Sequence, residues 1–592
     1  MVSESNPIYV ALLPALDTLY DLQARRVCSP NFNEHHERAR LLNKTAQHVS
    51  EQWVSFSNNA PRSHSGSITR RLKYLIIGNG SGNIQVQSHA MLLSCRSRKN
   101  IWTPFARGLC PAVSFFMSQV IKKVLIANRG EIALRIVRAC AEANIRSVAV
   151  YTEPDRYGLF VKRANEAYSL GSDPLTGYLD PTRIVNLAVE TGCDAIHPGY
   201  GFLSENPELA RLCAEKGVTF IGPSAEVIRR MGDKTQARLA MIEAGVPVTP
   251  GSPGNLDDIE QALAEASRIG YPVMVKATSG GGGRGIRRCD NEEELRKQFP
   301  RVISEATKAF GSAEVFMEKC IVNPKHIEVQ ILADRHGNVI HLYERDCSIQ
   351  RRNQKLIEIA PSPQISDELR HRLGKLAVKA ARAVGYESAG TVEFLLVNED
   401  VYFMEMNTRI QVEHTITEQI TGIDIVQEQL RIAAGAPLNF SQETVSFRGY
   451  AMQLRINAED PKNDFLPSFG RITHYYAPGG PGVRVDTAIY TGYEIPPFYD
   501  SMCLKLIVWA LDWESLLARA QRAIDDMRLH GIRTTANYYQ QILQHPDFRS
   551  REFDTSFVAN HPELSRYSDK KHPSDVALAL AAAIAAYAGI SN

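Results

Sequence analysis

The 592-residue chain lacks any pair of cysteines in C-x-x-C spacing, although it contains ten cysteines. This absence argues against a zinc ribbon, a redox dithiol and a disulfide framework. The chain also lacks a long apolar run. The longest, residues 576–590, would extend only about 22 Å as a helix, which is too short for a bilayer core. We therefore expect no membrane span and a reducing compartment, the cytoplasm.

The chain also has almost no net charge, since it contains 67 basic and 65 acidic residues. We therefore expect no general affinity for nucleic acid or for an anionic membrane, and any phosphate site has to be local. Two nucleotide-binding signatures are absent: G-x-G-x-x-G after the first strand, and G-x-x-x-x-G-K-[ST] anywhere. The remaining composition, 44% hydrophobic and 22% charged, is that of a globular protein with several domains.

Residues 1–116 lack sustained periodicity, and residues 61–116 contain no Asp or Glu. Targeting peptides are also poor in acids, but they start at the N-terminus, where this chain has Glu4 and Asp17. We expect a poorly structured extension. A second interpretation is that the segment is non-native, because Met117 has the character of a natural start directly before a strong strand.

From residue 120 onwards, strands and helices alternate. The strand at 124–127, the helix at 132–143 and the strand at 147–151 form a βαβ unit, and the alternation continues to a strand at 218–221. This order predicts a doubly wound, mostly parallel sheet.

Residues 390–414 have the pattern of a hairpin in which two β-rich runs flank the turn-like triplet 398–400. With the turn centred on its middle residue, Glu393 lies opposite Glu405, and Asn407 shares their face. Facing carboxylates repel each other unless a cation lies between them, and magnesium prefers such oxygen ligands. The alternative is a solvated hairpin face.

Two other stretches are rich in groups that suit phosphate. The strand at 271–277 contains Lys276 and runs into a glycine-rich loop at 278–285, whose N–H groups can cradle phosphate oxygens, although glycine runs are also simple turns. The stretch 343–355 is either an exposed charged loop or a counterweight to an anionic substrate. It holds four cations: Arg345, Arg351, Arg352 and Lys355.

Six motifs then stand in order: IANRGEIA (126–133), HPGYGFLSEN (197–206), KATSGGGGRG (276–285), ERDCSIQRRNQK (344–355), EMNTRIQVEH (405–414) and RINAED (455–460). Through them the chain resembles, over residues 117 to about 565, the biotin carboxylase component of biotin-dependent carboxylases, an ATP-grasp family. The sequences SIQRRNQKLIEIAPSP and VEHTITE and the C-terminal ending resemble most closely the A subunit of two-subunit pyruvate carboxylases.

The resemblance implies a biotin carboxylase or ATP-grasp fold of mixed α/β and α+β class. Its parts would be a doubly wound N-terminal domain, an ATP-grasp domain with a mobile glycine-rich lid, a C-terminal α+β domain, and a tail with a helix that docks a partner. Their expected bounds are 117–231, 232–447 with the lid at about 250–320, 448–565 and 566–592.

The resemblance also implies site residues. Magnesium or manganese would be held by Glu393, Glu405 and Asn407. ATP would contact Lys234, Lys276, Gly282 and Gly283 through its phosphates, and Glu318, Lys319, Ile321, His326, Gln350 and Leu395 on its adenosine side. The bicarbonate and biotin pocket would consist of Lys355, Arg409, Gln411, Val412, Glu413 and Arg455.

Glu413 would then act as the general base on bicarbonate, which attacks the γ-phosphoryl group of ATP to give carboxyphosphate. Arg455 would hold the biotin enolate, Arg409 would orient the reacting groups, and Lys355 completes the catalytic set. The chain has no Met-Lys-Met biotin attachment motif, so biotin has to come from another chain. The implied partner is a biotinylated carboxyltransferase or carrier subunit, and the chain itself would form a homodimer within a larger assembly.

Three rival interpretations stay open. Another ATP-grasp ligase, joining a carboxylate to an amine, would share Lys276, the glycine loop and the two glutamates but would not need Glu413 with Arg455. A non-enzymatic regulatory homologue would have lost metal ligands, and none is missing here. The biotin carboxylase subunit of acetyl-CoA carboxylase would have the same site. Asn353, Thr415 and Ile416 depart from the more usual histidine, proline and valine.

Overall fold

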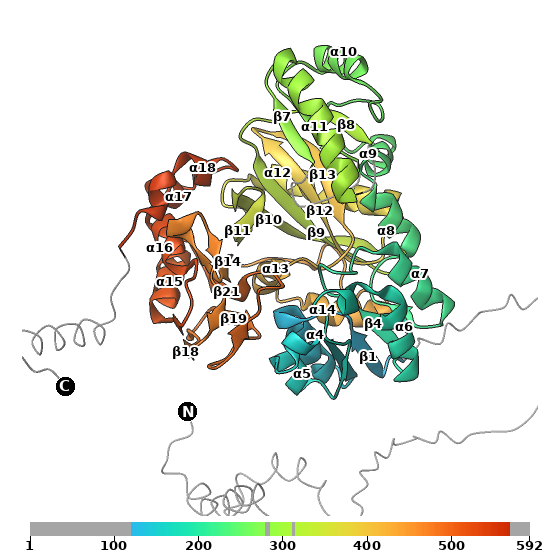
Figure 1. Cartoon of the computed structure of the whole chain (residues 1–592), viewed down its shortest axis with the longest axis vertical. Helices are drawn as coiled ribbons and strands as arrows, with labels where there is room; N and C mark the ends of the chain where they lie inside the picture. The colour runs from blue at the N-terminus through green and yellow to red at the C-terminus, as the bar shows by residue number, and fades with distance from the viewer. Residues whose placement is uncertain (1–119, 279–284, 311–313, 569–592) are drawn as a thin grey trace, which may run out of the picture. The chain divides into compact units, whose positions relative to one another are not determined.

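The computed structural model describes residues 120–278, 285–310 and 314–568 (Figure 1). The extension before residue 117, the loop glycines Gly282 and Gly283 and the tail helix at 575–588 lie outside these ranges, so their predicted roles stay predictions. Within the described ranges, the cysteines are buried and unpaired, and no helix is long and apolar enough to cross a membrane.

The predicted parallel sheet is confirmed at the start of the described chain. Its five strands lie in the order β3-β2-β1-β4-β5, and all four pairings are parallel. The strands are β1 (Lys123–Ile126), β2 (Arg146–Tyr151), β3 (Glu166–Ser169), β4 (Ala195–His197) and β5 (Thr219–Phe220). Helices α4 (Gly130–Glu142), α6 (Pro181–Glu190) and α7 (Pro207–Glu215) connect them. One hydrophobic core joins α4 to α14 (Ile425–Ala433), far along the chain.

A smaller sheet follows, with its own hydrophobic core around Val275 and Met317. It consists of β6 (Val273–Ala277), β7 (Ile286–Cys289) and β8 (Val315–Lys319) in the order β7-β6-β8, with helices α10 (Ile259–Ile269) and α11 (Glu292–Phe310). These elements lie in the range predicted for the lid. Helix α9 (Lys234–Glu243) precedes them, capped by Asp233 and followed by Gly245 at φ +61°.

The site lies on an antiparallel sheet of eight strands, β13-β12-β9-β10-β11-β14-β21-β19. The strands are β9 (Lys325–Ala333), β10 (Val339–Arg351), β11 (Gln354–Ala360), β12 (Ser388–Val397), β13 (Asp400–Asn407), β14 (Tyr450–Asn457), β19 (Val483–Thr487) and β21 (Met502–Ala510). Strands β11 and β14 pair across the boundary that the sequence places at 447/448. The ATP-grasp and C-terminal regions therefore share one continuous sheet.

Helices cover parts of this sheet (Figure 1). Helix α12 (Asp367–Ala383), capped by Ser366, packs on β9 and β10, and α15 (Trp513–Asp526) packs on β14 and β21. Helix α13 (His414–Thr421) contacts β10, β11 and β14. The described C-terminal part continues through α16 (Ala536–Gln544), α17 (Pro546–Arg549), α18 (Phe557–Asn560) and the short 3-10 helix η5 (Pro562–Ser565).

Candidate active site

The β12–β13 hairpin has the predicted carboxylate pair, although the turn differs from the prediction. Glu393 and Glu405 are direct cross-strand partners. Near the turn, however, Val397 pairs with Asp400, so the loop has two residues and is not centred on the middle of the triplet. A β-bulge at Met404 adds one residue to β13 and restores the predicted register at the glutamates.

The pair belongs to a row of charged side chains that crosses four neighbouring strands. Glu405 on β13 faces Glu393 on β12, which faces Glu328 on β9, which in turn faces Arg345 on β10. Glu328 and Arg345 are fully buried. Three neighbouring carboxylates in a buried row need cations close by, and the structure supplies them from β10 and β11.

Lys355 is the main counter-charge. Its Nζ lies 2.6 Å from Glu328, 2.7 Å from Glu413 and 3.1 Å from Glu393. Burial alone would lower the pKa of Lys355, but the surrounding anionic groups hold it well above its ordinary value. Lys355 is therefore a permanent cation at the point where the row meets Glu413.

Glu413 is held between two cations. Its Oε1 accepts from Lys355 at 2.7 Å, and its Oε2 accepts from Arg455 at 3.0 Å. The Arg455 Nε in turn donates to Glu358 at 2.5 Å. Burial would raise the pKa of Glu413, but Lys355 and Arg455 outweigh burial and hold that pKa well below its usual range. The carboxylate is ionised, and it does not cap the helix α13 that follows it.

The two predicted metal carboxylates differ in their surroundings. Glu393 accepts hydrogen bonds from Asn407 and Gln411, both at 2.7 Å, as well as from Lys355, and its other oxygen lies 2.5 Å from His326. Burial would raise the pKa of Glu393, but these neighbours hold it well below its ordinary value.

Glu405, in contrast, has a raised pKa, first through burial and then through the neighbouring charge of Glu393. Burial lowers the pKa of nearby Lys234, although Glu405 opposes that shift. An added cation would stabilise the charged form of Glu405, and an added anion would stabilise the charged form of Lys234. Two carboxylates and an amide are hard oxygen donors of the kind that magnesium takes, so the residues present fit the metal. The Asn407 amide oxygen accepts from Arg409 at 3.0 Å, a bond it would exchange to become a ligand.

The remaining predicted ATP residues are divided between the smaller sheet and the large sheet. Lys276 on β6 bonds Glu318 on β8, and the Lys319 ammonium donates to the carbonyls of Gly270 and Tyr271. Ile321 follows β8. On the large sheet, Leu395 lies opposite His326, and Gln350 lies opposite Lys355.

Several residues of the site have partners that the sequence does not identify. Arg345 donates to Gln330 and to Gln411, both at 2.7 Å, and also bonds Glu328. Glu205 of the HPGYGFLSEN loop lies 3.0 Å from Arg409. Strand alternation in β9 predicts that Glu328 shares a face with its polar neighbours, but only the structure shows which face. The partners of Arg345 are distant in sequence, so no local pattern identifies them.

Lys505 on β21 anchors the segment that leads into helix α13. Its Nζ donates to the Val412 carbonyl at 3.0 Å and lies 3.1 Å from Glu131 in the first turn of α4. Lys505 is fully buried, and Glu131 is almost so. The predicted bicarbonate-site residue Val412 is therefore fixed by a strand of the C-terminal region and by the N-terminal domain together.

We expect Lys505→Met to lower the free energy of unfolding by about 3–5 kcal/mol, because it leaves Glu131 buried without its cation. Urea unfolding of the complete chain measures this change. The double variant Lys505→Met, Glu131→Gln should recover most of the loss, since it removes the unpaired charge as well. Equal stability of the single and double variants would contradict the coupling.

The site therefore joins the smaller sheet, which supplies lysines, to the larger sheet, which supplies paired carboxylates. This is the arrangement of an ATP-grasp ligase, an ATP-dependent enzyme. In agreement, residues 233–441 match the family described as carbamoyl-phosphate synthase L chain, ATP binding domain. Residues 120–228 match the biotin carboxylase N-terminal domain, and residues 453–560 match the biotin carboxylase C-terminal domain. The chain belongs to the biotin carboxylase family.

Similar proteins cover the same part of the chain. The 2-oxoglutarate carboxylase small subunit of Hydrogenobacter thermophilus is 53% identical over 472 residues, 80% of this chain and 100% of that protein. The A subunit of pyruvate carboxylase from Methanothermobacter thermautotrophicus is 52% identical over 440 residues, 74% and 90% of the two chains. A crystal structure of the biotin carboxylase domain dimer of the Hydrogenobacter enzyme, with MgADP, ADP and bicarbonate, has 55% identity and a TM-score of 0.75, covering 76% and 100%.

Proposed function

We propose that this chain is the biotin carboxylase subunit of a two-subunit 2-oxo-acid carboxylase, with pyruvate as the final acceptor. It would use ATP and bicarbonate to carboxylate biotin on a separate carrier chain. The observation that carries this proposal is the ionised Glu413, held between Lys355 and Arg455 on the sheet where Glu393 and Glu405 face each other. A ligase that joins a carboxylate to an amine has no need of this arrangement.

The first step is the attack of bicarbonate on the γ-phosphoryl group of ATP. Glu413 accepts the bicarbonate proton, while Lys234 and Lys276 offset the negative charge on the phosphates. Glu393, Glu405 and Asn407 would hold magnesium, which supplies charge neutralisation at the phosphate oxygens. The products are carboxyphosphate and ADP.

The low pKa of Glu413 makes it a weak base in the ligand-free protein. Lys355 has three carboxylate partners, and Arg455 has two. When anionic substrates enter, both cations gain new partners and release part of their hold on Glu413. Its pKa then rises towards the range in which a general base works well. The substrate itself would therefore activate the base.

Carboxyphosphate then releases carbon dioxide, and its phosphate takes the proton of the biotin ureido nitrogen. Arg455 stabilises the resulting enolate, because a guanidinium stays protonated at every working pH. Arg409, fixed by Glu205 and by Asn407, orients the reacting groups from the other side.

We expect added free biotin to stimulate ATP cleavage that requires bicarbonate. The reason is that biotin consumes the carboxyphosphate product, whereas an amine-joining ligase would not respond to it. Release of phosphate, measured with and without biotin at saturating ATP, magnesium and bicarbonate, checks this. The same assay with an amine and a carboxylate in place of biotin is the control. ATP cleavage that ignores biotin but responds to an amine would refute the proposal.

The final acceptor depends on the partner subunit. Pyruvate is favoured by the relative named as the A subunit of a pyruvate carboxylase, and 2-oxoglutarate by the relative named 2-oxoglutarate carboxylase small subunit. An acetyl-CoA carboxylase has the same carboxylase chemistry. Co-purification from the source cells, followed by an assay of the complex with each acceptor, decides between the three. We further propose that the chain forms a homodimer, as the biotin carboxylase domain of the Hydrogenobacter enzyme does.

A further inference from the structure

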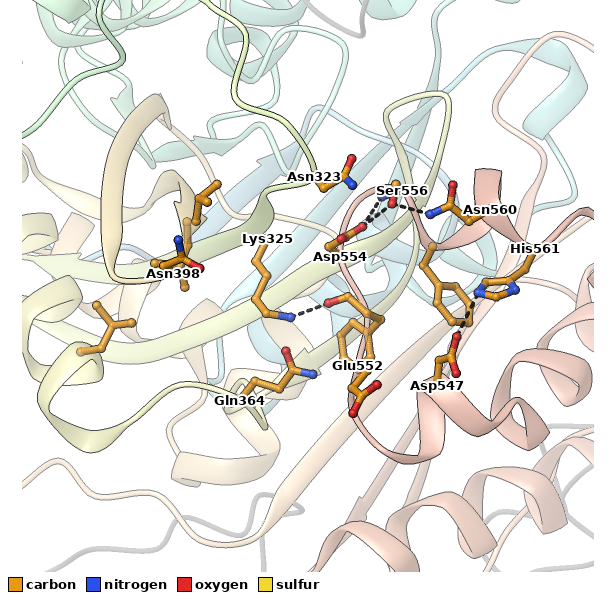
Figure 2. A pocket seen from close by; sticks show the side chains of 15 residues that line it. Asn323, Lys325, Gln364, Asn398, Asp547, Glu552, Asp554, Ser556, Asn560 and His561 are labelled. Atoms are coloured by element: carbon orange, nitrogen blue, oxygen red, sulfur yellow. Dashed lines mark hydrogen bonds and ion pairs between the residues drawn. The ribbon is translucent and has the colours of Figure 1, made fainter.

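A cavity of about 650 Å³ lies between the large sheet and the C-terminal segment (Figure 2). Its walls come from the start of β9, the β12–β13 turn and residues 547–561. Asp547 and His561 stand at its edge and contact each other. The reaction described above uses neither residue.

These two residues belong to a repeated local motif. His545-Pro546-Asp547 begins helix α17, and His561-Pro562-Glu563 begins the 3-10 helix η5. In both, proline stands at the first helical position, where its fixed φ favours the helix start. The two motifs pack against each other, with the imidazole centroids 4.1 Å apart, and Phe557 covers both rings.

The acid of each motif reaches the histidine of the other. The Asp547 carboxylate lies 3.3 Å from Nε2 of His561, and the Glu563 carboxylate lies 3.7 Å from Nε2 of His545. Glu563 also lies 2.9 Å from Nδ1 of His561. Nitrogens of both imidazoles and an oxygen of Glu563 are within 4.8 Å of one another.

We propose that His545, His561 and Glu563 form a zinc site that clamps the two helix starts together. Tetrahedral ligands about 2.1 Å from zinc stand roughly 3.4 Å apart, and the distances of 2.9 and 3.7 Å from Glu563 to the two imidazoles bracket that value. Two imidazoles and one carboxylate are a zinc ligand set, and the side chain of Glu563 is half exposed, so water can complete the coordination.

Asp547 supplies the outer partner that metal-binding histidines usually have. With Nδ1 of His561 on zinc, Nε2 keeps its proton and donates it to Asp547, which fixes the tautomer and orients the ring. His545 changes more. Its Nδ1 accepts from the Asp547 N–H at 3.3 Å, a long bond that is lost when zinc takes Nε2 and the ring proton moves to Nδ1.

The test uses the complete chain without a histidine tag, stripped with a chelator and then dialysed against zinc in the presence of excess magnesium, which competes at the oxygen-rich active site. Metal analysis should show one zinc more per chain in the wild type than in His561→Gln. Asp547→Asn should retain the site with an affinity about 10–100-fold lower.

His530→Gln is the matched control. His530 and His474 also form a histidine pair, with ring centroids 5.8 Å apart. In the described part of the chain, neither belongs to a group of three side chains that could hold a metal ion. This variant should bind as much zinc as the wild type.

Glu563→Gln tests the site if a histidine variant fails to fold, because Glu563 is exposed. Zinc should raise the unfolding temperature of the wild type and of His530→Gln, but not that of Glu563→Gln. Equal zinc content and an equal thermal response in the wild type, His561→Gln and Glu563→Gln would overturn the proposal.

Discussion

Replacing Glu413 by glutamine is expected to abolish biotin-dependent ATP cleavage while the protein stays folded. The amide cannot take a proton from bicarbonate, and loss of a general base alone costs about 10²–10⁴-fold in rate. Both Glu413 oxygens now accept hydrogen bonds, one from Lys355 and one from Arg455. Glutamine replaces one of these acceptors by an N–H₂ donor, which would face a donor. The rate of phosphate release at saturating substrates measures the effect.

The fold should survive this change, because both cations keep other carboxylate partners. Lys355 retains Glu328 and Glu393, and Arg455 retains Glu358. A suitable control is Glu344→Gln, since Glu344 is a buried glutamate that bonds Arg370 away from the site. A Glu413→Gln protein that turns over at nearly the wild-type rate would show that another group is the base.

The pH dependence of stability follows from the direction of the same shift. Because the folded-state pKa of Glu413 lies below its unfolded value, the ionised carboxylate contributes stability above the unfolded pKa, near 4.3. That contribution is lost as the pH falls towards the folded pKa. Glu393 has the same sign, so these two carboxylates lose their contribution only in acid, whereas Glu405, whose pKa is raised, has the opposite sign.

Local sequence patterns predict that Glu393 and Glu405 face each other, but they do not predict the bulge that sets this register. Strand alternation assigns Glu393 and Glu405 to one face, and a slip by one residue would have moved one of them to the other face. The bulge at Met404 prevents that slip. Neither glycine nor proline marks this position, so the sequence gives no sign of the bulge.

The sequence shows four clustered cations at 343–355, but it does not show that they pair with different acids. Arg345 and Lys355 are drawn into the site by Glu328, whereas Arg351 and Arg352 pair with Asp464. Arg345 and Lys355 thus balance a buried carboxylate of the chain, and Arg352 is exposed as the interpretation of a charged loop predicts. The choice depends on acids that are distant in the chain, and only the folded sheet brings them together.

Lys505 and Glu358 escaped prediction for a related reason. Both stand in strands of mainly apolar residues, and their partners Glu131 and Arg455 lie on other elements. The family motifs indicate the residues that we propose to surround the reacting atoms, whereas the ion pairs that support those residues are visible only when β11, β14 and β21 are side by side.

Replacing Arg455 by alanine is expected to reduce biotin carboxylation by roughly 10³-fold or more, because the enolate loses its cation and Glu413 loses one of its two partners. The change also leaves the fully buried Glu358 without Arg455, which should cost about 3–5 kcal/mol of stability. Loss of activity in this variant alone could therefore reflect unfolding.

The double variant Arg455→Ala, Glu358→Gln separates the two effects. Gln453 still donates to position 358, so removing the unpaired charge should restore most of the stability. Activity should stay lost, because the guanidinium is needed for the reaction itself. Arg455→Lys keeps a charge but cannot span Glu358 and Glu413 with one planar group, so it should fold well and carboxylate poorly. A stable double variant with nearly normal carboxylation of free biotin would show that Arg455 has only a structural role.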